Sequence, residues 1–243
     1  MKGVVLAAGR GERLAALGLG VPKPMVPLAG KPLLEHTVAL LRQHGVCELF
    51  INLHHDGDAI VSYFDKGQNF GVKIHYLSEA QLSGTAGPLR VWERALRTGT
   101  FLVVYGDVLT DVDLAGLLEF HRTRQATATI GVHRSEEPER CGVLSFDEAG
   151  RVTRFIEKPG PHEVFSTWVN AGLYALEPNV LDAIPSEGEA DFGRDVFPAL
   201  VRSGRSVYAY PLDGYLIDVG APDRYAQAEE DLRTGRCVTY AAG

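Results

Sequence analysis

Apolar runs of strand length alternate with amphipathic segments over the first half of the 243-residue chain. This alternation is typical of βα units, in which helices cover both faces of a parallel sheet. The expected strands are residues 3–7, 48–53, 73–77 and 101–105, and the expected helices are residues 33–44, 59–64, 88–97 and 114–122. We therefore predict an α/β fold with a Rossmann-like sheet that is mixed, mostly parallel and flanked by helices.

The pattern changes after Ala126. The segments TATIGVHR, CGVLSFD, RVTRFIEK and FSTWVNAGLYAL have strand character with turn signals between them, which favours a mixed or antiparallel extension. A strand pair is expected near residues 206–210 and 215–219, with helices at residues 194–201 and 223–233 on either side. Because no repeat or linker divides the chain, we expect a single domain over residues 1–243, whose two halves, residues 1–125 and 126–243, differ in pattern.

The charge balance limits the classes of partner. A net charge of −7 argues against a nucleic-acid surface, so an anionic ligand would need a local cluster of positive side chains. No apolar run approaches the roughly 20 residues that cross a bilayer, and the start MKGVVLAAGRGE becomes charged too early for a signal peptide. We expect a cytoplasmic protein with no nucleic-acid or membrane partner. The 3 cysteines are widely spaced and indicate neither a disulfide framework nor a metal site.

The segment GRGERLAALGLGVPKPMVP follows the first expected strand. Ligands of open parallel sheets bind beyond the carboxyl ends of the strands, so this loop is placed to contact one. Gly9 and Gly11 allow N–H groups to approach phosphate oxygens closely, and Arg13 and Lys23 add positive charge. The prolines on both sides of Lys23 predict an extended, rigid mount for its side chain. The alternative is a flexible surface loop with an incidental lysine.

Two common phosphate motifs do not fit this segment. The dinucleotide pattern GxGxxG would need a glycine where Leu14 stands, and no acidic residue ends the second strand, LFINLHH, to hold a ribose. The Walker pattern would need GK[ST], whereas Lys23 lies between two prolines. The failed dinucleotide pattern disfavours an oxidoreductase.

The segments LAAGRGERL and PKPMVPLAGKPLLEH resemble the signature of the nucleoside-diphosphate-sugar pyrophosphorylases, the sugar-1-phosphate nucleotidyltransferases. The usual family form is GxGTRL, so Glu12 replaces a threonine, which affects one loop hydrogen bond and leaves the arginine in place. SGTAGPL, VVYGDVLTD, IEKP, VNAGLYAL and YLIDVGAPDRY resemble further family segments in the family's order. The resemblance implies the nucleotide-diphospho-sugar transferase fold with a sugar-side β extension. It also implies a single nucleotidyltransferase domain, with a nucleotide-binding half at residues 1–125 and a sugar-binding half at residues 126–243. It implies the short form without a C-terminal β-helix, nearest in character to the mannose- and heptose-1-phosphate guanylyltransferases.

The resemblance also implies a reaction, in which an oxygen of a sugar 1-phosphate attacks the α-phosphorus of a nucleoside triphosphate and releases pyrophosphate. The implied catalytic residues are Arg13, Lys23 and Asp107. The implied nucleotide-binding residues are Leu6, Ala8, Gly9, Gly11, Arg13, Lys23, Glu79, Gly84 and Thr85. The implied sugar-phosphate-binding residues are Gly142, Glu157, Lys158 and Asn170.

Two aspartates are expected to bind Mg²⁺. Asp107 follows the apolar run FLVVYG and Asp218 follows YLI, so both carboxylates lie at strand ends. Mg²⁺ prefers hard oxygen ligands and keeps part of its water shell, so two carboxylates and the substrate phosphates can complete a site. A turn or helix-cap role is the alternative for either aspartate alone. His54 and His55 are expected to be loop residues rather than metal ligands.

Specificity is less constrained by the sequence. A carboxylate at Glu79 suits the N1–H and amino donors of guanine, so GTP and a GDP-sugar product are expected, while UTP, CTP, dTTP and ATP stay open. The DVD string at residues 111–113 leaves a DxD glycosyltransferase as a rival, although Asp113 fits a cap of the following helix. A non-catalytic sugar-nucleotide sensor is another rival. The identity of the sugar and the formation of a homodimer are open.

We expect loss of Lys23 or Arg13 to reduce turnover far more than stability, because exposed loop cations add little stability.

Overall fold

The computed structural model describes residues 1–9, 11, 14 and 18–239, and two compact units can be distinguished in it. Unit 1 comprises Met1–Leu82, Val104–Leu114 and the described residues from Asp213 onward. Unit 2 comprises Ser83–Val103 and Ala115–Leu212. Strand β6 (Phe101–Tyr105) and helix α4 (Leu114–Thr123) each contain residues of both units. The expected single domain with halves at residues 1–125 and 126–243 stays a prediction.

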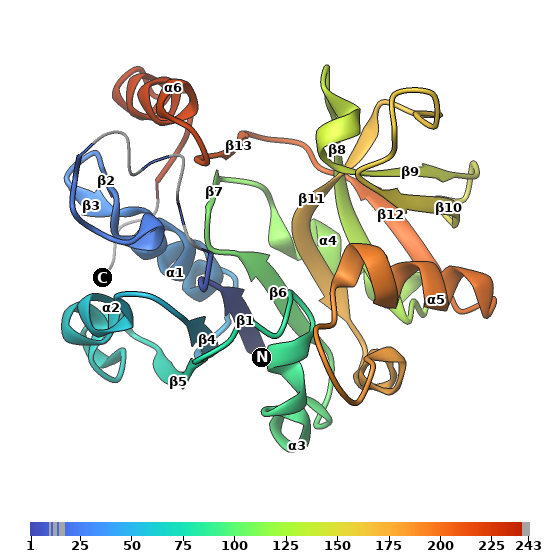
Figure 1. The fold of residues 1–243 in the computed structure, drawn as a ribbon, viewed down its shortest axis with the longest axis horizontal. Coiled ribbons are helices and arrows are strands. Elements are labelled where there is room, and N and C mark those ends of the chain that lie inside the picture. Colours follow the sequence, from blue (N-terminus) through green and yellow to red (C-terminus); the bar gives the residue numbers. More distant parts are fainter. Residues whose placement is uncertain (10, 12–13, 15–17, 240–243) are drawn as a thin grey trace. The chain divides into compact units, whose positions relative to one another are not determined.

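In unit 1, three strands pair in parallel in the order β1 (Lys2–Leu6), β4 (Glu48–Leu53) and β5 (Lys73–Ser78) (Figure 1). Most side chains of β1 and β4 are buried, as expected for apolar strands that are covered on both faces. The register aligns Leu6 with Asn52, and Leu53 with Ser78, so the three carboxyl ends form one edge. The parallel arrangement expected for the first part of the chain is confirmed.

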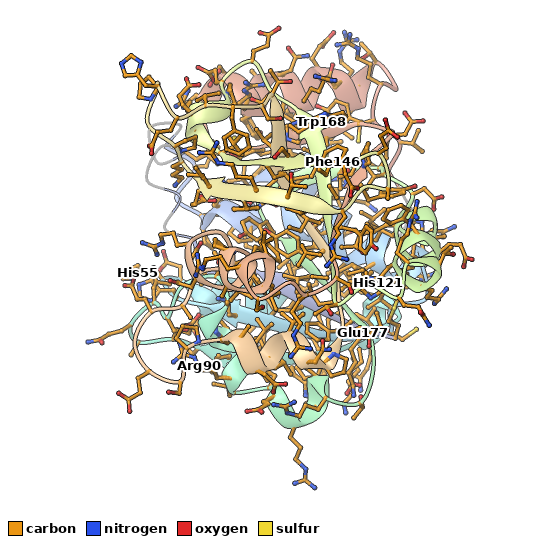
Figure 2. The ribbon with its side chains drawn as sticks, turned by 90° about the vertical axis from the view of Figure 1, so that its right-hand side faces the viewer. His55, Arg90, His121, Phe146, Trp168 and Glu177 are labelled. Atoms are coloured by element: carbon orange, nitrogen blue, oxygen red, sulfur yellow. The ribbon has the colours of Figure 1, made fainter. Side chains whose placement is uncertain are left out.

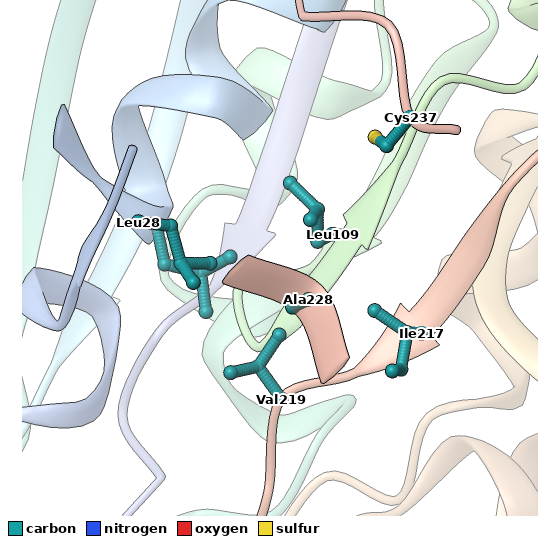
Figure 3. Packing of buried hydrophobic residues seen from close by; sticks show 7 residues of the cluster. Leu28, Leu109, Ile217, Val219, Ala228 and Cys237 are labelled. Carbon is teal, nitrogen blue, oxygen red and sulfur yellow. The ribbon is translucent and has the colours of Figure 1, made fainter. Parts of the chain in front are cut away.

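The helices of unit 1 are α1 (Leu33–Gln43), α2 (Gly57–Phe64) and α6 (Pro222–Arg233), with single turns η2 (Lys23–Met25) and η3 (Gln68–Phe70). Two short antiparallel pairs, β2 (Pro27–Leu28) with β3 (Lys31–Pro32) and β7 (Val108–Thr110) with β13 (Leu216–Asp218), complete it. A hydrophobic cluster joins these elements, with Leu28 on β2, Leu109 on β7, Ile217 on β13 and Ala228 on α6 (Figure 3). Burial of these side chains fixes β13 beside β7, although the two strands are far apart in sequence.

In unit 2, β8 (Ala128–Arg134) pairs antiparallel with β11 (Trp168–Leu176) and parallel with β12 (Val207–Pro211). Strand β9 (Gly142–Phe146) pairs antiparallel with β11 and with β10 (Val152–Glu157). The mixed extension expected after Ala126 is therefore confirmed. The expected strand pair at residues 206–210 and 215–219 is wrong, because β12 pairs with β8 whereas β13 pairs with β7.

The helical segments of unit 2 include η5 (Pro138–Arg140) and η6 (Pro178–Ala183) and depart from expectation at two places. The helix expected at residues 88–97 is a 3-10 turn, η4 (Gly87–Arg90), followed by the short α3 (Glu93–Leu96). Leu89 and Trp92 are both buried, and residues three apart face the same side in a 3-10 turn. The helix expected at residues 194–201 begins earlier, as a π turn η7 (Phe192–Val196) that continues into α5 (Phe197–Arg202).

A buried polar contact braces α4 in unit 2. His121 is almost fully buried, its Nδ1 lies 2.8 Å from Thr129 Oγ1 and its Nε2 lies 3.3 Å from Glu177 Oε1 (Figure 2). Burial lowers the pKa of His121, and the contact with Glu177 opposes that shift. His121 is therefore a neutral structural side chain near pH 7. Among the described residues, none of the helices has the length and apolar character that crossing a membrane requires.

Candidate active site

One buried amide ties together the carboxyl ends of β1, β4 and β5. Asn52 lies in β4, and its Oδ1 accepts a hydrogen bond of 2.9 Å from Ala7 N. Its Nδ2 donates a 2.7 Å hydrogen bond to Glu79 Oε1, just after β5. Because buried polar groups need partners, this amide fixes both the start of the glycine loop and the Glu79 carboxylate. Asn52 was missed from the sequence; the signal was a single amide inside the buried run LFINL.

Asp107 and Asp218 are placed by close backbone contacts. Gly106 N donates a 2.9 Å hydrogen bond to Leu6 O, and a Cβ at Gly106 would lie 3.1 Å from that same oxygen. A side chain at this position would therefore be crowded where the chain passes beside the end of β1. The pairing of β7 with β13 aligns Asp218 with Val108, and Val219 N donates to Asp107 O at 2.9 Å. Two carboxylates from distant parts of the sequence consequently lie side by side.

Lys23 joins these two carboxylates. Its Nζ lies 2.7 Å from Asp107 Oδ2 and 3.2 Å from Asp218 Oδ1. The Lys23 side chain is only 7% exposed, whereas the side chains of Asp107 and Asp218 are 35% and 60% exposed. The buried Lys23 ammonium group therefore contacts two partly exposed carboxylates at once.

Two expectations about Lys23 are wrong. Pro22 is extended, but Lys23 itself begins the 3-10 turn η2 with Pro24 buried behind it, so the mount is a tight turn rather than an extended segment. Lys23 is also not an exposed loop cation, since its side chain is buried against two carboxylates. Its loss must therefore affect stability as well as turnover.

The glycine loop packs on Lys23. Gly11 has a φ of +62°, and a Cβ there would lie 2.9 Å from Lys23 Cβ, so both conformation and space require glycine. Gly9 is exposed and a Cβ would meet no atom within 4 Å. Ala8 is buried next to it. The predicted catalytic residue Arg13 lies outside the described residues.

The acidic pair fits a divalent cation with few protein ligands. No group of three or more His, Cys, Asp or Glu side chains within the described parts of the chain is arranged to hold a metal ion. The same two carboxylate oxygens already face one cation, the Lys23 ammonium. Mg²⁺ keeps several waters and is often held by one or two carboxylates with substrate phosphates, so the donor set suits it. His54 Nδ1 lies 2.7 Å from Glu79 O, which accounts for that histidine structurally.

In unit 2, the carboxylate of Glu157 stands at the end of β10 between two glycines. A Cβ at Gly142 would lie 2.6 Å from Glu157 Oε2, and a Cβ at Gly193 would collide with the same oxygen. Burial raises the pKa of Glu157, and the charge of Asp191 adds to that shift. No described residue donates a hydrogen bond to this carboxylate, so its acceptors are available to a polar ligand such as a sugar hydroxyl.

Two further predicted sugar-site residues lie in the same unit. Lys158 is exposed and has a φ of +47°. This backbone conformation is unfavourable for residues other than glycine, and such residues cluster at functional sites. Asn170 Nδ2 donates a 2.8 Å hydrogen bond to Tyr174 Oη, and Asn170 Oδ1 accepts one of 3.0 Å from Gly172 N. Asn170 therefore supports an irregularity in β11, and its contact with sugar stays a prediction.

The predicted base-binding segment is fastened within unit 2. Gly84 has a φ of +86°, and a Cβ there would collide with the carbonyl of Ala190. The Thr85 hydroxyl donates a 2.8 Å hydrogen bond to Asp191 Oδ2 and accepts one of 2.9 Å from Phe192 N. Both residues thus have roles in the fold, and their contacts with a nucleotide stay predictions.

The DVD string is explained by backbone contacts in unit 1. Asp111 Oδ1 accepts a 2.7 Å hydrogen bond from Tyr215 N, and its Oδ2 accepts one of 2.9 Å from Val238 N. Asp113 Oδ1 lies 3.4 Å from His44 Nε2. Because both carboxylate oxygens of Asp111 hold the backbone, the string is a poor ligand for a metal bound to a nucleotide-sugar.

Comparison with known proteins identifies the family of this chain. A family model described as nucleotidyl transferase matches residues 2–235. The chain belongs to the nucleotidyl transferase family. The family resemblance expected from the sequence is therefore confirmed.

Two curated relatives illustrate the range of the family. A UTP–glucose-1-phosphate uridylyltransferase of Synechocystis is 39% identical over 241 residues, which cover 94% of this chain and 62% of the relative. A mannose-1-phosphate guanylyltransferase of Mycobacterium tuberculosis is 36% identical over 233 residues, covering 96% of this chain and 64% of the relative. The chain thus spans less than two thirds of the length of these relatives.

Solved structures share the fold. A Bacillus anthracis protein assigned as a glucose-1-phosphate thymidylyltransferase aligns with a TM-score of 0.86 and 25% identity, covering 99% of this chain and 97% of that one. A UDP-glucose pyrophosphorylase bound to UDP-glucose aligns with a TM-score of 0.81 and 20% identity, covering 96% and 98%. The expected nucleotide-diphospho-sugar transferase fold is confirmed.

Proposed function

We propose that this chain joins a sugar 1-phosphate to a nucleoside triphosphate, giving a nucleoside-diphosphate sugar and pyrophosphate. The observation that carries the proposal is the convergence of Asp107 and Asp218 on Lys23 Nζ, beside the carboxyl ends of the parallel strands. That edge is where open α/β sheets bind their ligands. Membership of the nucleotidyl transferase family supports the same chemistry.

The unit 1 cluster suits the triphosphate. Both substrates are anions, so the protein must hold like charges in line and offset the charge that develops in the transition state. Lys23, buried and packed on Gly11, supplies a positive charge in a fixed position. Arg13 and the N–H groups around Gly9 are proposed to bind the phosphates with it. Leu6, the last residue of β1, and Ala8, at the start of the loop, are proposed to contact the nucleotide with them.

Mg²⁺ is the proposed metal, since nucleotidyl transferases of this family generally use a divalent ion. Asp107 and Asp218 would hold it together with phosphate oxygens. When bound, it would neutralise part of the triphosphate charge. The same two carboxylates also orient the Lys23 ammonium. They would therefore hold two positive charges beside the phosphates, the metal ion and Lys23.

The unit 2 cluster suits the sugar phosphate. Glu157 offers a carboxylate to which none of the described residues donates a hydrogen bond, and which can accept hydrogen bonds from sugar hydroxyls. Lys158 is exposed beside it in sequence and is proposed to bind the sugar phosphate. Gly142 leaves room beside the Glu157 carboxylate, and Asn170 is proposed to contact the sugar ring.

GTP is the proposed nucleotide. The Glu79 carboxylate is held by Asn52 at the edge of the parallel strands, and an acceptor of this kind suits the paired N–H donors of guanine. The guanylyltransferase among the relatives supports this choice, whereas the uridylyltransferase of Synechocystis makes UTP the second candidate. A cytoplasmic location and a homodimer stay predictions.

The test is a matrix of five nucleoside triphosphates against a panel of sugar 1-phosphates, with Mg²⁺ and detection of released pyrophosphate. We expect release with at least one pair, and with GTP among the triphosphates. Lys73→Met on the exposed surface is the matched control for Lys23→Met. Binding of substrates with no pyrophosphate exchange would favour the non-catalytic sensor. Release of a nucleoside diphosphate from a nucleotide-sugar would favour a glycosyltransferase.

A further inference from the structure

We propose that Thr85 is a positioning residue for the sugar phosphate, acting through Asp191 and Gly193 on the carboxylate of Glu157. The inference rests on the proposed function and assigns a task to a residue that the sequence alone places at the nucleotide. All four residues belong to unit 2.

The Thr85 hydroxyl forms hydrogen bonds with residues at the start of η7. It donates to Asp191 Oδ2 at 2.8 Å and accepts from Phe192 N at 2.9 Å. The backbone on either side is fastened to the same segment, because Ala86 N donates to Ala190 O and Ala190 N donates to Ser83 O, each at 2.8 Å. A hydroxyl has one donor, so Thr85 already uses it inside the protein.

Asp191 transmits this contact to the start of η7. Its Oδ1 accepts hydrogen bonds from Gly193 N at 2.9 Å and Arg194 N at 3.1 Å, so it caps the turn. Its own N–H donates to Asp195 Oδ2 at 2.8 Å, which closes a reciprocal pair across the first turn. Thr85 therefore holds the one oxygen of Asp191 that does not cap the helix.

Gly193 is the point of contact with Glu157. Its backbone lies so close to the Glu157 carboxylate that a Cβ would overlap Oε2 and crowd Cδ. Gly193 and Gly142 thus leave the space that the Glu157 carboxylate occupies, so a shift of the Gly193 backbone would change the room available to that carboxylate. Thr85 holds Asp191, and Asp191 holds Gly193. Through these contacts Thr85 orients the Glu157 carboxylate, to which none of the described residues donates a hydrogen bond.

The charge distribution favours the same role. Asp191 and Glu157 are both carboxylates, and the Asp191 charge raises the pKa of Glu157. The Thr85 hydroxyl directs one Asp191 oxygen toward itself. Without that donor, Asp191 can turn, the cap of η7 loosens and the Glu157 carboxylate loses its fixed orientation.

The experiment measures KM for the sugar 1-phosphate and KM for the triphosphate separately, in the full chain, for four variants. Thr85→Val keeps the shape and removes the donor; Thr85→Ser keeps the donor. Gly193→Ala perturbs Glu157 directly without touching Thr85. Thr153→Val is the matched control, because Thr153 is an exposed threonine whose side chain forms hydrogen bonds with Ser145, far from Thr85 in sequence.

We expect Thr85→Val to raise KM for the sugar 1-phosphate about tenfold while KM for the triphosphate changes less than about twofold. Thr85→Ser should restore the parent value, and Gly193→Ala should reproduce the Thr85→Val effect. The control Thr153→Val should leave both constants unchanged.

Other outcomes overturn the inference. A rise in the triphosphate KM alone would place Thr85 at the nucleotide. Unchanged KM values in Thr85→Val or in Gly193→Ala would show that Thr85 does not position Glu157. If Thr85→Val does not fold, the KM values of Thr85→Ser and Gly193→Ala test the inference in its place. A parent protein that releases no pyrophosphate with any substrate pair would refute the proposed function, and this inference with it.

Discussion

Replacing Lys23 with methionine should weaken the fold and the reaction by separable amounts. Methionine keeps most of the side-chain stem that packs on Gly11 but removes the ammonium that Asp107 and Asp218 share. A charge-assisted hydrogen bond contributes about 1.5–3 kcal/mol, which applies to the 2.7 Å contact with Asp107. The Asp218 side chain is 60% exposed, so its pair adds only about 0–1 kcal/mol.

The expected loss of unfolding free energy is therefore about 2 kcal/mol, which corresponds to a Tm lower by about 4–8 °C for a chain of this size. Differential scanning fluorimetry in EDTA measures it. Turnover should fall by about 10²–10³, because a positioned charge on the phosphates is lost. Lys73→Met, whose side chain is 68% exposed, should lower Tm by less than about 2 °C.

Added Mg²⁺ should raise the Tm of Lys23→Met more than that of the parent protein, because a divalent cation can replace the missing charge between the two carboxylates. A variant with the parent's Tm and with turnover within about threefold of the parent would refute the reasoning. Equal Mg²⁺ effects on the two proteins would show that the carboxylates do not share a cation site.

Three further outcomes are expected. Asn52→Leu removes the acceptor of the Ala7 N–H and one donor to the Glu79 carboxylate, so unfolding in urea should show a loss of about 3 kcal/mol and KM for the triphosphate should rise; an unchanged midpoint would contradict this. Gly11→Ala forces a side chain to a φ of +62° and against Lys23, so it should reduce turnover and cost about 1–2 kcal/mol, whereas Gly9→Ala meets no atom within 4 Å and should cost less stability; equal losses would remove the packing argument. Burial lowers the pKa of His121, so the unfolded chain binds a proton at higher pH than the folded chain, and stability should fall as the pH decreases below about 6.5; His121→Gln should flatten this dependence in urea titrations at pH 7.5 and pH 5.5, and an unchanged slope would contradict it.

Local patterns predicted the strands of unit 1 well. The expected strands at residues 48–53 and 101–105 coincide with β4 and β6, because continuous apolar runs bounded by turn residues are a strong signal. The carboxyl-edge rule placed the glycine loop at a ligand-binding edge, and Asp107 was expected at a strand end, whereas Glu79 was named by the family resemblance. Strand partners after residue 200 were not predictable, because β12 and β13 are short and similar in pattern while their partners lie far away in sequence.

Burial and hydrogen bonding were the harder part of the site to predict. A lysine between prolines in a glycine-rich segment has the local composition of an exposed loop, and only the arrival of Asp107 and Asp218 from distant strands makes it a buried cation. The Thr85 contact with Asp191 likewise joins positions 106 residues apart. Family resemblance names such residues without giving their contacts, so Thr85 could be assigned to a nucleotide but not to its protein partner.

The central claim is that Asp107 and Asp218 act together as one cation site in nucleotidyl transfer. Exchange of labelled pyrophosphate into the triphosphate, driven by the nucleotide-sugar product with Mg²⁺, tests it in the parent protein, Asp107→Asn, Asp218→Asn and the double variant. We expect exchange in the parent, a loss of about 10² or more in each single variant, and no further loss in the double variant. Exchange that survives either single substitution, or losses that multiply in the double variant, would contradict the account.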